Sequence, residues 1–332
     1  MKSDLTDRGA GSVRRLLVGY KAQDLDASLV AGDVVCHALD IYHKNAIESA
    51  WHVKAVCTPH LPEGPWDEIR FKTGPKLMSG ELALDLMQEI ARLSPDARLW
   101  GGSAATPKVF VDFVGRERDR NDLIDKIRDN PGRVRDFSAK WLASVPGGPK
   151  VEFVSYPGCF CHRRHDEGGL ALAEVASRDL SASTSPVKIL DMGCGCGLVG
   201  CLIASVVENV SLTMVDSHSR AIEAATLNAK NLGLDSQILL SADGAPPEMD
   251  GTFDVFVGNP PYYSDYRIAD VFLETAARAL KKGGVCYTVV KNDAGLKPVQ
   301  ERWFPSVEVI HRRGYCVLKS HKSDSFGIIR KL

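Results

Sequence analysis

The feature that most constrains this 332-residue sequence is the run Asp-Met-Gly-Cys-Gly-Cys-Gly at residues 191–197, which stands between an apolar strand and an apolar helix. The alternating glycines Gly193, Gly195 and Gly197 let the backbone turn sharply and approach a ligand closely. The helix that follows would present its N-terminal amides to that ligand. Dinucleotide enzymes also use a glycine-rich turn, and such a turn can be purely structural. The acidic Asp191, however, would repel a pyrophosphate and would pair with an amino group or a sulfonium-bearing amino acid.

Strands and helices alternate through the second half of the chain. The apolar pattern predicts strands at 188–191, 212–216, 237–240, 253–257 and 285–290, and helices at 198–207, 219–232 and 268–280. Residues 281–284 are expected to end the last helix. This alternation predicts a parallel, doubly wound α/β sheet. The segments 307–311 and 315–319 predict a terminal hairpin that adds an antiparallel strand at or near the sheet edge.

Two further acids follow strands of this series. Asp216 ends the second strand, where a carboxylate suits the two hydroxyls of a ribose. Asp243 follows the third strand and could accept a hydrogen bond from an adenine amino group, or could simply cap a turn. Both lie where doubly wound sheets bind ligands, at the carboxyl ends of the strands.

The turn Asn259-Pro260-Pro261-Tyr262 follows the fourth strand at the same edge. Two prolines fix the backbone and remove two donors, which leaves the Asn259 side-chain oxygen and the Pro260 carbonyl as acceptors. An exocyclic amine is a poor nucleophile because its lone pair is delocalised into the ring, and two acceptors on its hydrogens would favour the geometry of attack. Tyr262 offers a face on which a base can stack. An ordinary proline turn is the alternative.

The first half also has an α/β pattern, but no Gly-x-Gly turn in the equivalent place. Strands at 34–39 and 53–57 enclose a helix, and the segments 66–71, 81–93 and 97–100 follow the strand–helix–strand order of residues 253–290. This favours a degenerate copy of the second half, although any two such units share a layout. The Pro/Gly-rich residues 146–149 are typical of a linker. We therefore expect domains at 1–148 and 149–332.

Composition places few limits on function. With 44% hydrophobic and 25% charged residues, the chain has enough apolar material for two cores. We expect no membrane span, no secretory signal and a cytoplasmic location, because no long apolar run is present and nine cysteines are scattered. The net charge of −1 argues against non-specific coating of nucleic acid but permits a local basic groove.

The segment Pro-Gly-Cys-Phe-Cys-His-Arg-Arg-His-Asp-Glu-Gly at 157–168 has two competing interpretations. It holds two cysteines and two histidines within seven residues, which raises a metal site. The Cys-x-Cys-His spacing is not a standard zinc spacing, so we predict no metal. We expect instead a loop folded over a cofactor, with Phe160 among the cofactor-binding residues and with Arg163 and Arg164 available to phosphate.

The region from about residue 154 to residue 319 resembles the methyltransferase small domain, which occurs in bacterial ribosomal RNA guanine-N2 methyltransferases. The resemblance rests on segment 157–168, the turn at 191–197, Asp216, the Asn-Pro-Pro-Tyr turn and the Ala-Arg-Ala-Leu-Lys-Lys-Gly-Gly run. It implies a Rossmann-like fold that binds S-adenosyl-L-methionine. It also places Asp191 and the glycines at the methionine end, Asp216 at the ribose, Asp243 at the adenine and Asn259 to Tyr262 at the methyl acceptor.

The resemblance further implies that the N-terminal domain is a decayed methyltransferase copy that helps to hold RNA. This chain departs from the family pattern in three places. Cys-His-Arg-Arg follows Phe160 where a hydrophobic residue and serine are commoner, Tyr262 stands where phenylalanine is usual, and the first half matches only in layout.

We therefore expect an S-adenosylmethionine-dependent enzyme that methylates an exocyclic amino group of an RNA base, guanine N2 of ribosomal RNA, without a metal. The oligomeric state is left open. A protein glutamine methyltransferase also uses Asn-Pro-Pro-Tyr but carries a small helical N-terminal domain, and the strands at 34–39 and 53–57 argue against it. A DNA adenine methyltransferase would need a further recognition domain. An idle RNA-binding or assembly protein would not need the intact glycine turn, Asp216 and Asn259.

Overall fold

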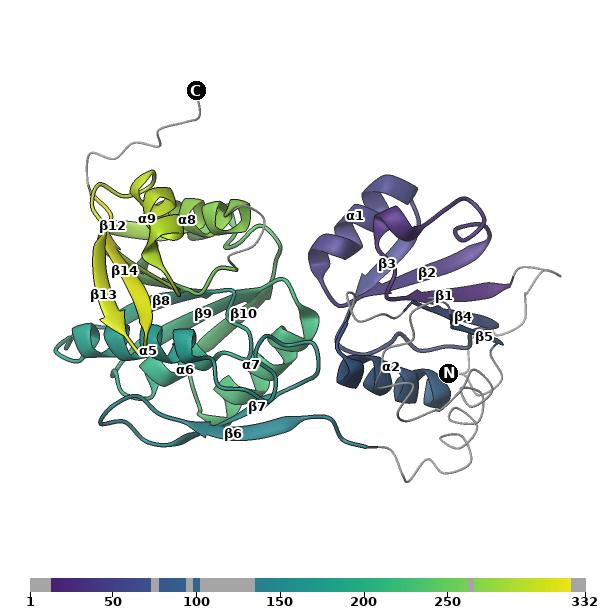
Figure 1. The fold of residues 1–332 in the computed structure, drawn as a ribbon, viewed down its shortest axis with the longest axis horizontal. Coiled ribbons are helices and arrows are strands. Elements are labelled where there is room, and N and C mark those ends of the chain that lie inside the picture. Colours follow the sequence, from purple (N-terminus) through teal and green to yellow (C-terminus); the bar gives the residue numbers. More distant parts are fainter. Residues whose placement is uncertain (1–12, 73–77, 94–97, 102–134, 262–265, 324–332) are drawn as a thin grey trace, which may run out of the picture. The chain divides into compact units, whose positions relative to one another are not determined.

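The computed structural model describes residues 13–72, 78–93, 98–101, 135–261 and 266–323. The chain divides into two compact units, Met1–Phe137 and Ser138–Leu332. Each unit has an α/β sheet and hydrophobic clusters of its own (Figure 1). In the described part, no helix is long and apolar enough to cross a membrane.

The division between the units lies before the Pro/Gly-rich stretch, not within it. Strands β6 (Ala139–Ala143) and β7 (Val151–Ser155) pair antiparallel, so residues 146–149 lie in the connection of a hairpin. The expected linker and the boundary at 148/149 are therefore corrected to 137/138. A Pro/Gly-rich run is as typical of a hairpin turn as of a linker. The composition of residues 146–149 does not indicate whether the segments on either side pair as strands.

The C-terminal unit is built on a seven-stranded sheet of order β10-β9-β8-β11-β12-β14-β13. The first five of these strands are parallel and the last two are antiparallel. In this order they are β10 (Ser236–Leu240), β9 (Val210–Asp216), β8 (Val187–Met192), β11 (Phe253–Gly258), β12 (Leu280–Val290), β14 (Tyr315–His321) and β13 (Glu308–Arg312). The predicted doubly wound sheet with a terminal hairpin is confirmed.

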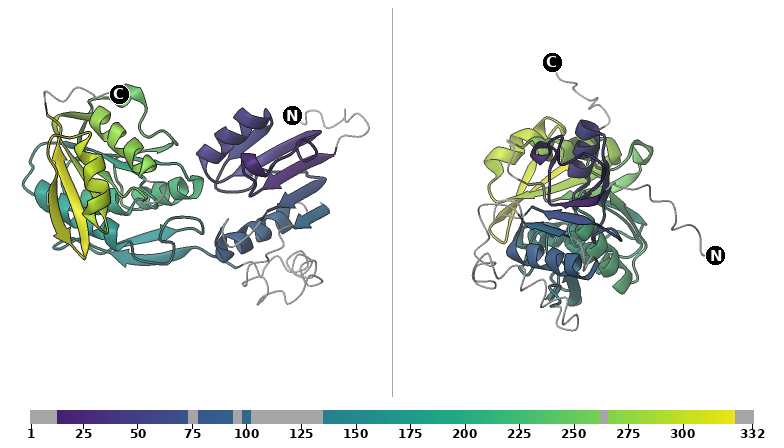
Figure 2. Two further views of the ribbon diagram at one scale, coloured as in Figure 1. Left: turned by 45° about the horizontal axis from the view of Figure 1, so that its top comes forward. Right: turned by 90° about the vertical axis from the view of Figure 1, so that its right-hand side faces the viewer.

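Helices cover both faces of this sheet (Figure 1, Figure 2). Ile189 and Leu190, neighbours on β8, are both fully buried and belong to different hydrophobic clusters, as expected of a parallel strand buried on both faces. One cluster contains residues of α5 (Glu167–Leu180), α6 (Leu198–Ala204) and α7 (Ser219–Asn231), and the other contains residues of α8 (Arg267–Ala279) and α9 (Asp293–Glu301).

Strand β12 begins earlier than the sequence pattern predicts. Leu280 pairs with Phe253 and Val285 pairs with Val255, so residues 281–284 form an irregularity within the strand and do not end the helix. The Gly283 amide donates to the Lys322 carbonyl at 2.9 Å, and the Lys322 amide donates to the Gly284 carbonyl at 2.9 Å. These bonds to a distant segment hold residues 281–284 in the sheet and override their turn-like composition.

The N-terminal unit has a five-stranded parallel sheet of order β3-β2-β1-β4-β5. Its strands are β1 (Arg14–Val18), β2 (Asp33–Ala38), β3 (Lys54–Cys57), β4 (Glu68–Phe71) and β5 (Arg98–Gly101). Helix α1 (Ile41–Trp51) connects β2 to β3, and α2 (Gly80–Leu93) precedes β5, whereas only the short 3-10 helix η1 (Ala22–Asp24) lies between β1 and β2. The sequence pattern predicted every one of these strands except β1. The strand order matches that of β10-β9-β8-β11-β12.

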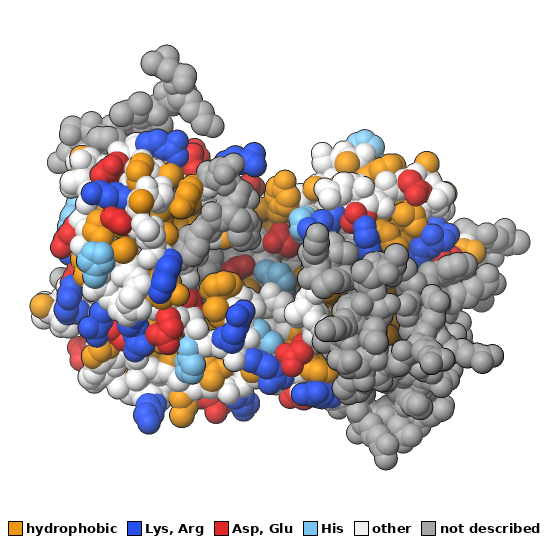
Figure 3. Space-filling model, in the orientation of Figure 1, with side chains coloured by type: hydrophobic (Ala, Val, Ile, Leu, Met, Phe, Trp, Pro, Cys, Tyr) orange, Lys and Arg blue, Asp and Glu red, His pale blue; other side chains and the backbone are white. Residues whose placement is uncertain are grey.

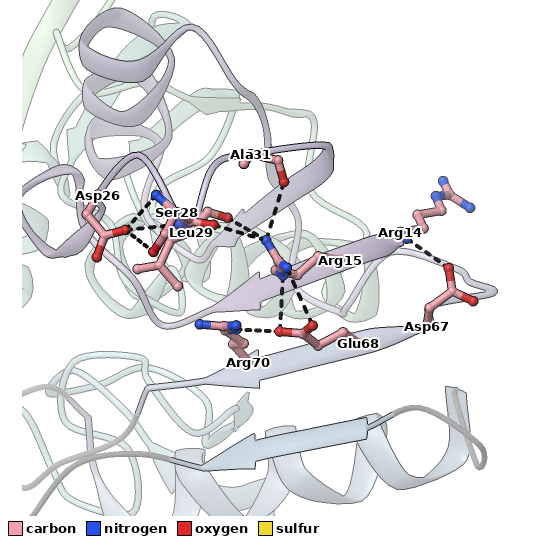
Figure 4. A network of polar contacts seen from close by, with 9 residues as sticks. All are labelled: Arg14, Arg15, Asp26, Ser28, Leu29, Ala31, Asp67, Glu68 and Arg70. Carbon is pink, nitrogen blue, oxygen red and sulfur yellow. Dashed lines mark hydrogen bonds and ion pairs between the residues drawn. The ribbon is translucent and has the colours of Figure 1, made fainter. Parts of the chain in front are cut away.

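A network of charged groups joins β1 to β4 in this unit (Figure 4). Glu68 accepts hydrogen bonds from Arg15, at 3.1 Å, and from Arg70. Arg15 also donates to the Leu29 carbonyl at 3.0 Å, which ties the β1–β2 connection to the same group. Burial acts to raise the pKa of Glu68, but the bonds from Arg70 and Arg15 outweigh it and lower that pKa.

We predict that Glu68→Gln destabilises the N-terminal unit by ~2 kcal/mol at neutral pH, because two arginines lose a buried anionic partner. The lowered pKa means that the ionised carboxylate stabilises the folded state above the ordinary pKa of a glutamate. This contribution is lost as the pH falls through the folded-state pKa. Hydrogen exchange of the β1 and β4 amides measures the effect for this unit alone.

Exposed Glu63 provides the matched control, and Glu63→Gln should leave the exchange rates unchanged. A Glu68→Gln variant as stable as the wild type at neutral pH, or an equal loss at neutral and acid pH, would contradict the assigned role.

Candidate active site

The glycine-rich turn lies at the carboxyl end of β8. Gly193, Gly195 and Gly197 have φ values of +67°, +55° and +83°, in the left-handed region that favours glycine. The Gly193 and Cys194 amides both donate to the Val215 carbonyl, at 2.8 and 3.1 Å, which fastens the turn to β9. A Cβ on Gly193 would lie 2.7 Å from the Phe272 ring, whereas one on Gly195 would meet no atom within 4 Å. Gly195 therefore faces open space.

Asp216, at the end of β9, is held against this turn. Its Oδ2 accepts a hydrogen bond from the Gly195 amide at 2.8 Å, and its Oδ1 accepts one from the His218 amide at 2.9 Å. Two backbone donors on different segments thus fix the orientation of the carboxylate beside the open space at Gly195.

Asp191 is buried at the end of β8, with 2% of its surface exposed. Its Oδ2 accepts a hydrogen bond from the Gly200 amide at 2.9 Å. Burial raises the pKa of Asp191 to about 7, against the effect of the Gly200 amide, and the charges of Asp216 and Asp166 raise it further. The negative charges of Asp216 and Asp166 thus disfavour the ionised form of Asp191, so a cationic ligand would be stabilised here.

Asn259 lies at the same edge of the sheet as the glycine-rich turn. Gly258, the last residue of β11, pairs in register with Met192, the last residue of β8, and Met192 pairs with Val215 of β9. The residues that follow these strands therefore emerge at one level. The expected placement of the two turns on a common edge is confirmed by this register.

The Asn259 side chain is oriented by Asp166, which sequence reasoning did not single out. The Asn259 Nδ2 donates to Asp166 Oδ2 at 3.1 Å, so the amide presents its oxygen, Oδ1, on the other side. Asp166 stands directly before α5, and burial raises its pKa against the lowering effect of the Gly169 amide, the Asn259 side chain and the Gly168 amide. A Cβ on Gly169 would lie 2.4 Å from Asp166 Oδ2, so only glycine leaves that oxygen in place.

The other predicted site residues are less constrained by contacts. Pro260 is buried and Pro261 is half-buried, while Tyr262 lies outside the described residues. Asp243 is exposed beyond β10, and its backbone amide donates a hydrogen bond to the Ser241 hydroxyl oxygen at 3.2 Å. Phe160 is 68% exposed.

The cysteines and histidines of segment 157–168 have different surroundings. Cys159 is buried, Cys161 is half-buried, and the His162 Nδ1 lies 3.0 Å from the Ser155 hydroxyl. The His165 ring packs edge-on against Trp141 with centroids 5.5 Å apart. Within the described ranges, no group of three potential metal ligands is close enough to hold an ion.

Two buried polar side chains of α7 support the site and were also missed. Asn228 is fully buried; it exchanges hydrogen bonds with the Val154 backbone, both at 2.9 Å, and donates to the Cys196 carbonyl at 2.8 Å. Buried Arg220 donates to the Pro157 carbonyl at 3.2 Å. Asn228 stands at the apolar spacing of Ala221, Ala224 and Ala225, and a polar residue at such a position is a signal that sequence reasoning could have used.

Known proteins share this chain's sequence and fold. The family model of the methyltransferase small domain matches residues 150–319. The ribosomal RNA small subunit methyltransferase C of Pseudomonas paraeruginosa is 31% identical over 318 residues, covering 86% of this chain and 88% of that protein. The ribosomal RNA large subunit methyltransferase G of Pseudomonas syringae is 31% identical over 183 residues, covering 52% of this chain and 47% of that protein. The match thus spans about half the length of that relative.

A solved structure extends the likeness to the fold of both units. The 16S rRNA N2 methyltransferase of T. thermophilus, in complex with AdoMet and guanosine, superimposes with a TM-score of 0.73 and 19% identity. The match covers 96% of this chain and 90% of that one. The arrangement of a Rossmann-like methyltransferase sheet preceded by a second α/β domain is thereby confirmed. On the family match and the 31% identity over most of its length, this chain belongs to the methyltransferase small domain family.

Proposed function

We propose that the protein is an S-adenosylmethionine-dependent methyltransferase that modifies the exocyclic N2 amino group of a guanine in ribosomal RNA, in the cytoplasm. The hydrogen bond between Asn259 and Asp166 carries the proposal, because it holds the NH2 group of Asn259 on Asp166 and leaves the amide oxygen directed away from that carboxylate, in a residue at the sheet edge that also bears Asp191 and the glycine turn. The names of the relatives as ribosomal RNA methyltransferases, and the AdoMet and guanosine bound to the T. thermophilus enzyme, support the choice of cofactor and substrate.

The residues at this edge fit S-adenosylmethionine. Its ammonium and sulfonium groups are positive, and they suit a site where Asp191, Asp216 and Asp166 lie close enough to raise the pKa of Asp191. Asp216 can accept hydrogen bonds from ribose hydroxyls, Gly195 leaves room for a ligand, and Asp243 and Phe160 would serve the adenine. The cofactor supplies an activated methyl group on a positively charged sulfur.

The chain's own part in the reaction is to grip and align the amine. Asn259 Oδ1 and the Pro260 carbonyl would accept the two N2 hydrogens, which favours a tetrahedral nitrogen whose lone pair is localised for attack instead of delocalised into the ring. Pro260 and Pro261 restrict the backbone, so these acceptors are held before the substrate arrives. Tyr262 would stack on the base. Alignment of this kind is worth up to ~7–11 kcal/mol in well-oriented reactions.

For the N-terminal unit we propose a degenerate methyltransferase copy that helps to hold RNA. Its strand order repeats that of the catalytic sheet. Its β1 is followed by Gly19, Tyr20 and the 3-10 helix η1, where β8 is followed by the glycine-rich turn and α6. A copy without that turn would keep the scaffold but not the cofactor site. Its five-stranded sheet also differs from the small helical domain of the rival protein glutamine methyltransferases.

Methyl transfer to ribosomal RNA tests the proposed function directly. The protein is incubated with labelled S-adenosylmethionine and either naked ribosomal RNA or ribosomal subunits, and the digested nucleosides are identified by mass spectrometry. We expect the label in N2-methylguanosine. Label found in protein glutamine, or in a different nucleoside, would contradict the proposal.

We predict that the affinity for S-adenosylmethionine rises with pH up to about 7, because burial raises the pKa of Asp191 to about 7 and only its ionised form attracts a cation. Below that pH the Kd should increase by about tenfold for each unit. Calorimetric titrations over a pH series measure this. Asp191→Asn should bind more weakly and without this dependence, whereas Asp235→Asn, at an exposed position before β10, should follow the wild type. A wild-type Kd that does not change with pH would refute the assignment.

We predict that Gly169→Ala lowers kcat ~10–100-fold, because the new methyl group displaces the Asp166 oxygen that orients Asn259. The Kd for S-adenosylmethionine should stay close to that of the wild type. Asn259→Ala should show the same split between kcat and cofactor affinity.

Asp166→Asn and Asp166→Ala separate positioning from a merely structural role. The asparagine keeps an oxygen that can accept from Asn259, so it should retain more activity than the alanine. Equal losses in both variants, or a Gly169→Ala protein with normal kcat and weakened cofactor binding, would show that Asp166 does not act through Asn259.

A further inference from the structure

A basic concave surface lies beside the candidate active site, within the C-terminal unit. This hollow of about 290 Å³ is lined mainly by Lys140 and Trp141 of β6 and by Arg163, Arg164 and His165 of the segment before α5. We call it the basic hollow. Three of its side chains belong to the Cys-His-Arg-Arg stretch and the histidine after it, where this chain departs from the family pattern, and the proposed methyl transfer uses none of them.

Two cations of the basic hollow, Lys140 and Arg164, have little or no neutralisation by carboxylates among the described residues. Arg163, Arg164 and His165 are exposed. Lys140 has a 3.4 Å ion pair with Glu152, but both side chains are more than half exposed, and such pairs are weak in water. In the described part of the chain, Arg164 has no carboxylate partner. On the face shown in Figure 3, basic and acidic side chains are interspersed.

One side of the basic hollow is formed by the aromatic ring of Trp141, which is held by contacts with two other rings. Trp141 stacks on Phe153 with ring centroids 5.2 Å apart and is met edge-on by His165 at 5.5 Å. The Trp141 indole N–H is buried and has no acceptor among the described residues. Cations beside a rigid aromatic ring are typical of surfaces that follow a single nucleic-acid strand. The volume lies at the lower end for ligand pockets, which suits a sugar-phosphate unit.

The basic hollow is joined to the acceptor site by a very short stretch of chain. Arg164 stands two residues before Asp166, a backbone separation of at most ~7 Å, and Asp166 holds the Asn259 side chain. Backbone bonds within the segment, from Arg164 to Cys161 at 2.9 Å and from His162 to Cys159 at 3.2 Å, make a compact turn. An RNA strand with one base at Asn259 would therefore have the phosphate of a neighbouring nucleotide at the basic hollow.

We propose that the basic hollow binds a backbone phosphate of the RNA strand that flanks the methylated nucleotide. The proposal rests on the proposed function, since it assumes that the acceptor base is part of RNA. Arg164 and Lys140 would neutralise the phosphate, and the Trp141 ring would restrict the position of the adjoining ribose. The site would increase the affinity for RNA and fix the position of the RNA strand relative to the protein, and it would take no part in the reaction.

Equilibrium binding of the full chain to a fluorescent single-stranded RNA, measured at a series of salt concentrations, tests this proposal. The double variant Lys140→Gln/Arg164→Gln should bind the RNA about tenfold more weakly at low salt. The slope of log Kd against log salt should fall by about 0.7 for each phosphate that the variant no longer neutralises. Arg164→Lys, which keeps the charge, should bind better than Arg164→Gln. Lys188→Gln, an exposed change at the amino end of β8, should match the wild type.

Affinity for S-adenosylmethionine serves as the check on folding and should be equal in all variants. Wild-type RNA affinity and salt slope in the double variant would overturn the proposal. RNA that binds through the basic hollow but is never methylated would instead contradict the proposed function and leave the phosphate site standing. The two failures are thus distinguished by reading RNA affinity and methyl transfer separately.

Discussion

The hydrogen bond from Asn259 to Asp166 joins two segments that are 93 residues apart and orients the Asn259 amide, on which the proposed methyl-acceptor site depends. A primary amide can turn either its NH2 group or its oxygen toward a ligand. The partly buried carboxylate of Asp166 removes that ambiguity because it can only accept while ionised. The sheet positions the other groups of the candidate site. In-register ends of β8, β9 and β11 bring a glycine turn, two acids and an amide to one level.

In the C-terminal unit, the acidic groups of the candidate site are more buried than the cations of the basic hollow. Burial and the nearby charges of Asp216 and Asp166 together bring the pKa of Asp191 to about 7. This is an unstable arrangement for an empty site and a favourable one for a cation. The basic hollow, by contrast, is exposed, where arginine and lysine remain well hydrated and can meet phosphate. A cationic cofactor and an anionic strand would thus be attracted to neighbouring but separate surfaces.

Much of the catalytic sheet was predictable because its signals are local. Apolar runs predicted the five parallel strands, and the glycine and proline residues predicted the two turns at the carboxyl edge of the sheet. What could not be predicted depends on contacts between distant segments. Residues 281–284 join a strand because Lys322 completes their hydrogen bonds, and residues 146–149 lie in a hairpin because β6 and β7 pair. In the sequence, nothing distinguishes Asp166 from other polar loop residues, because its role depends on the contact with Asn259 that the fold creates.

The most direct measurement is a crystal structure of the protein with S-adenosylhomocysteine and guanosine. We predict that the guanine N2 lies within ~3 Å of both Asn259 Oδ1 and the Pro260 carbonyl, while Asn259 Nδ2 still donates to Asp166. A guanine bound away from this edge would contradict it. So would an Asn259 side chain that turns its NH2 group toward the base and leaves Asp166 without its donor.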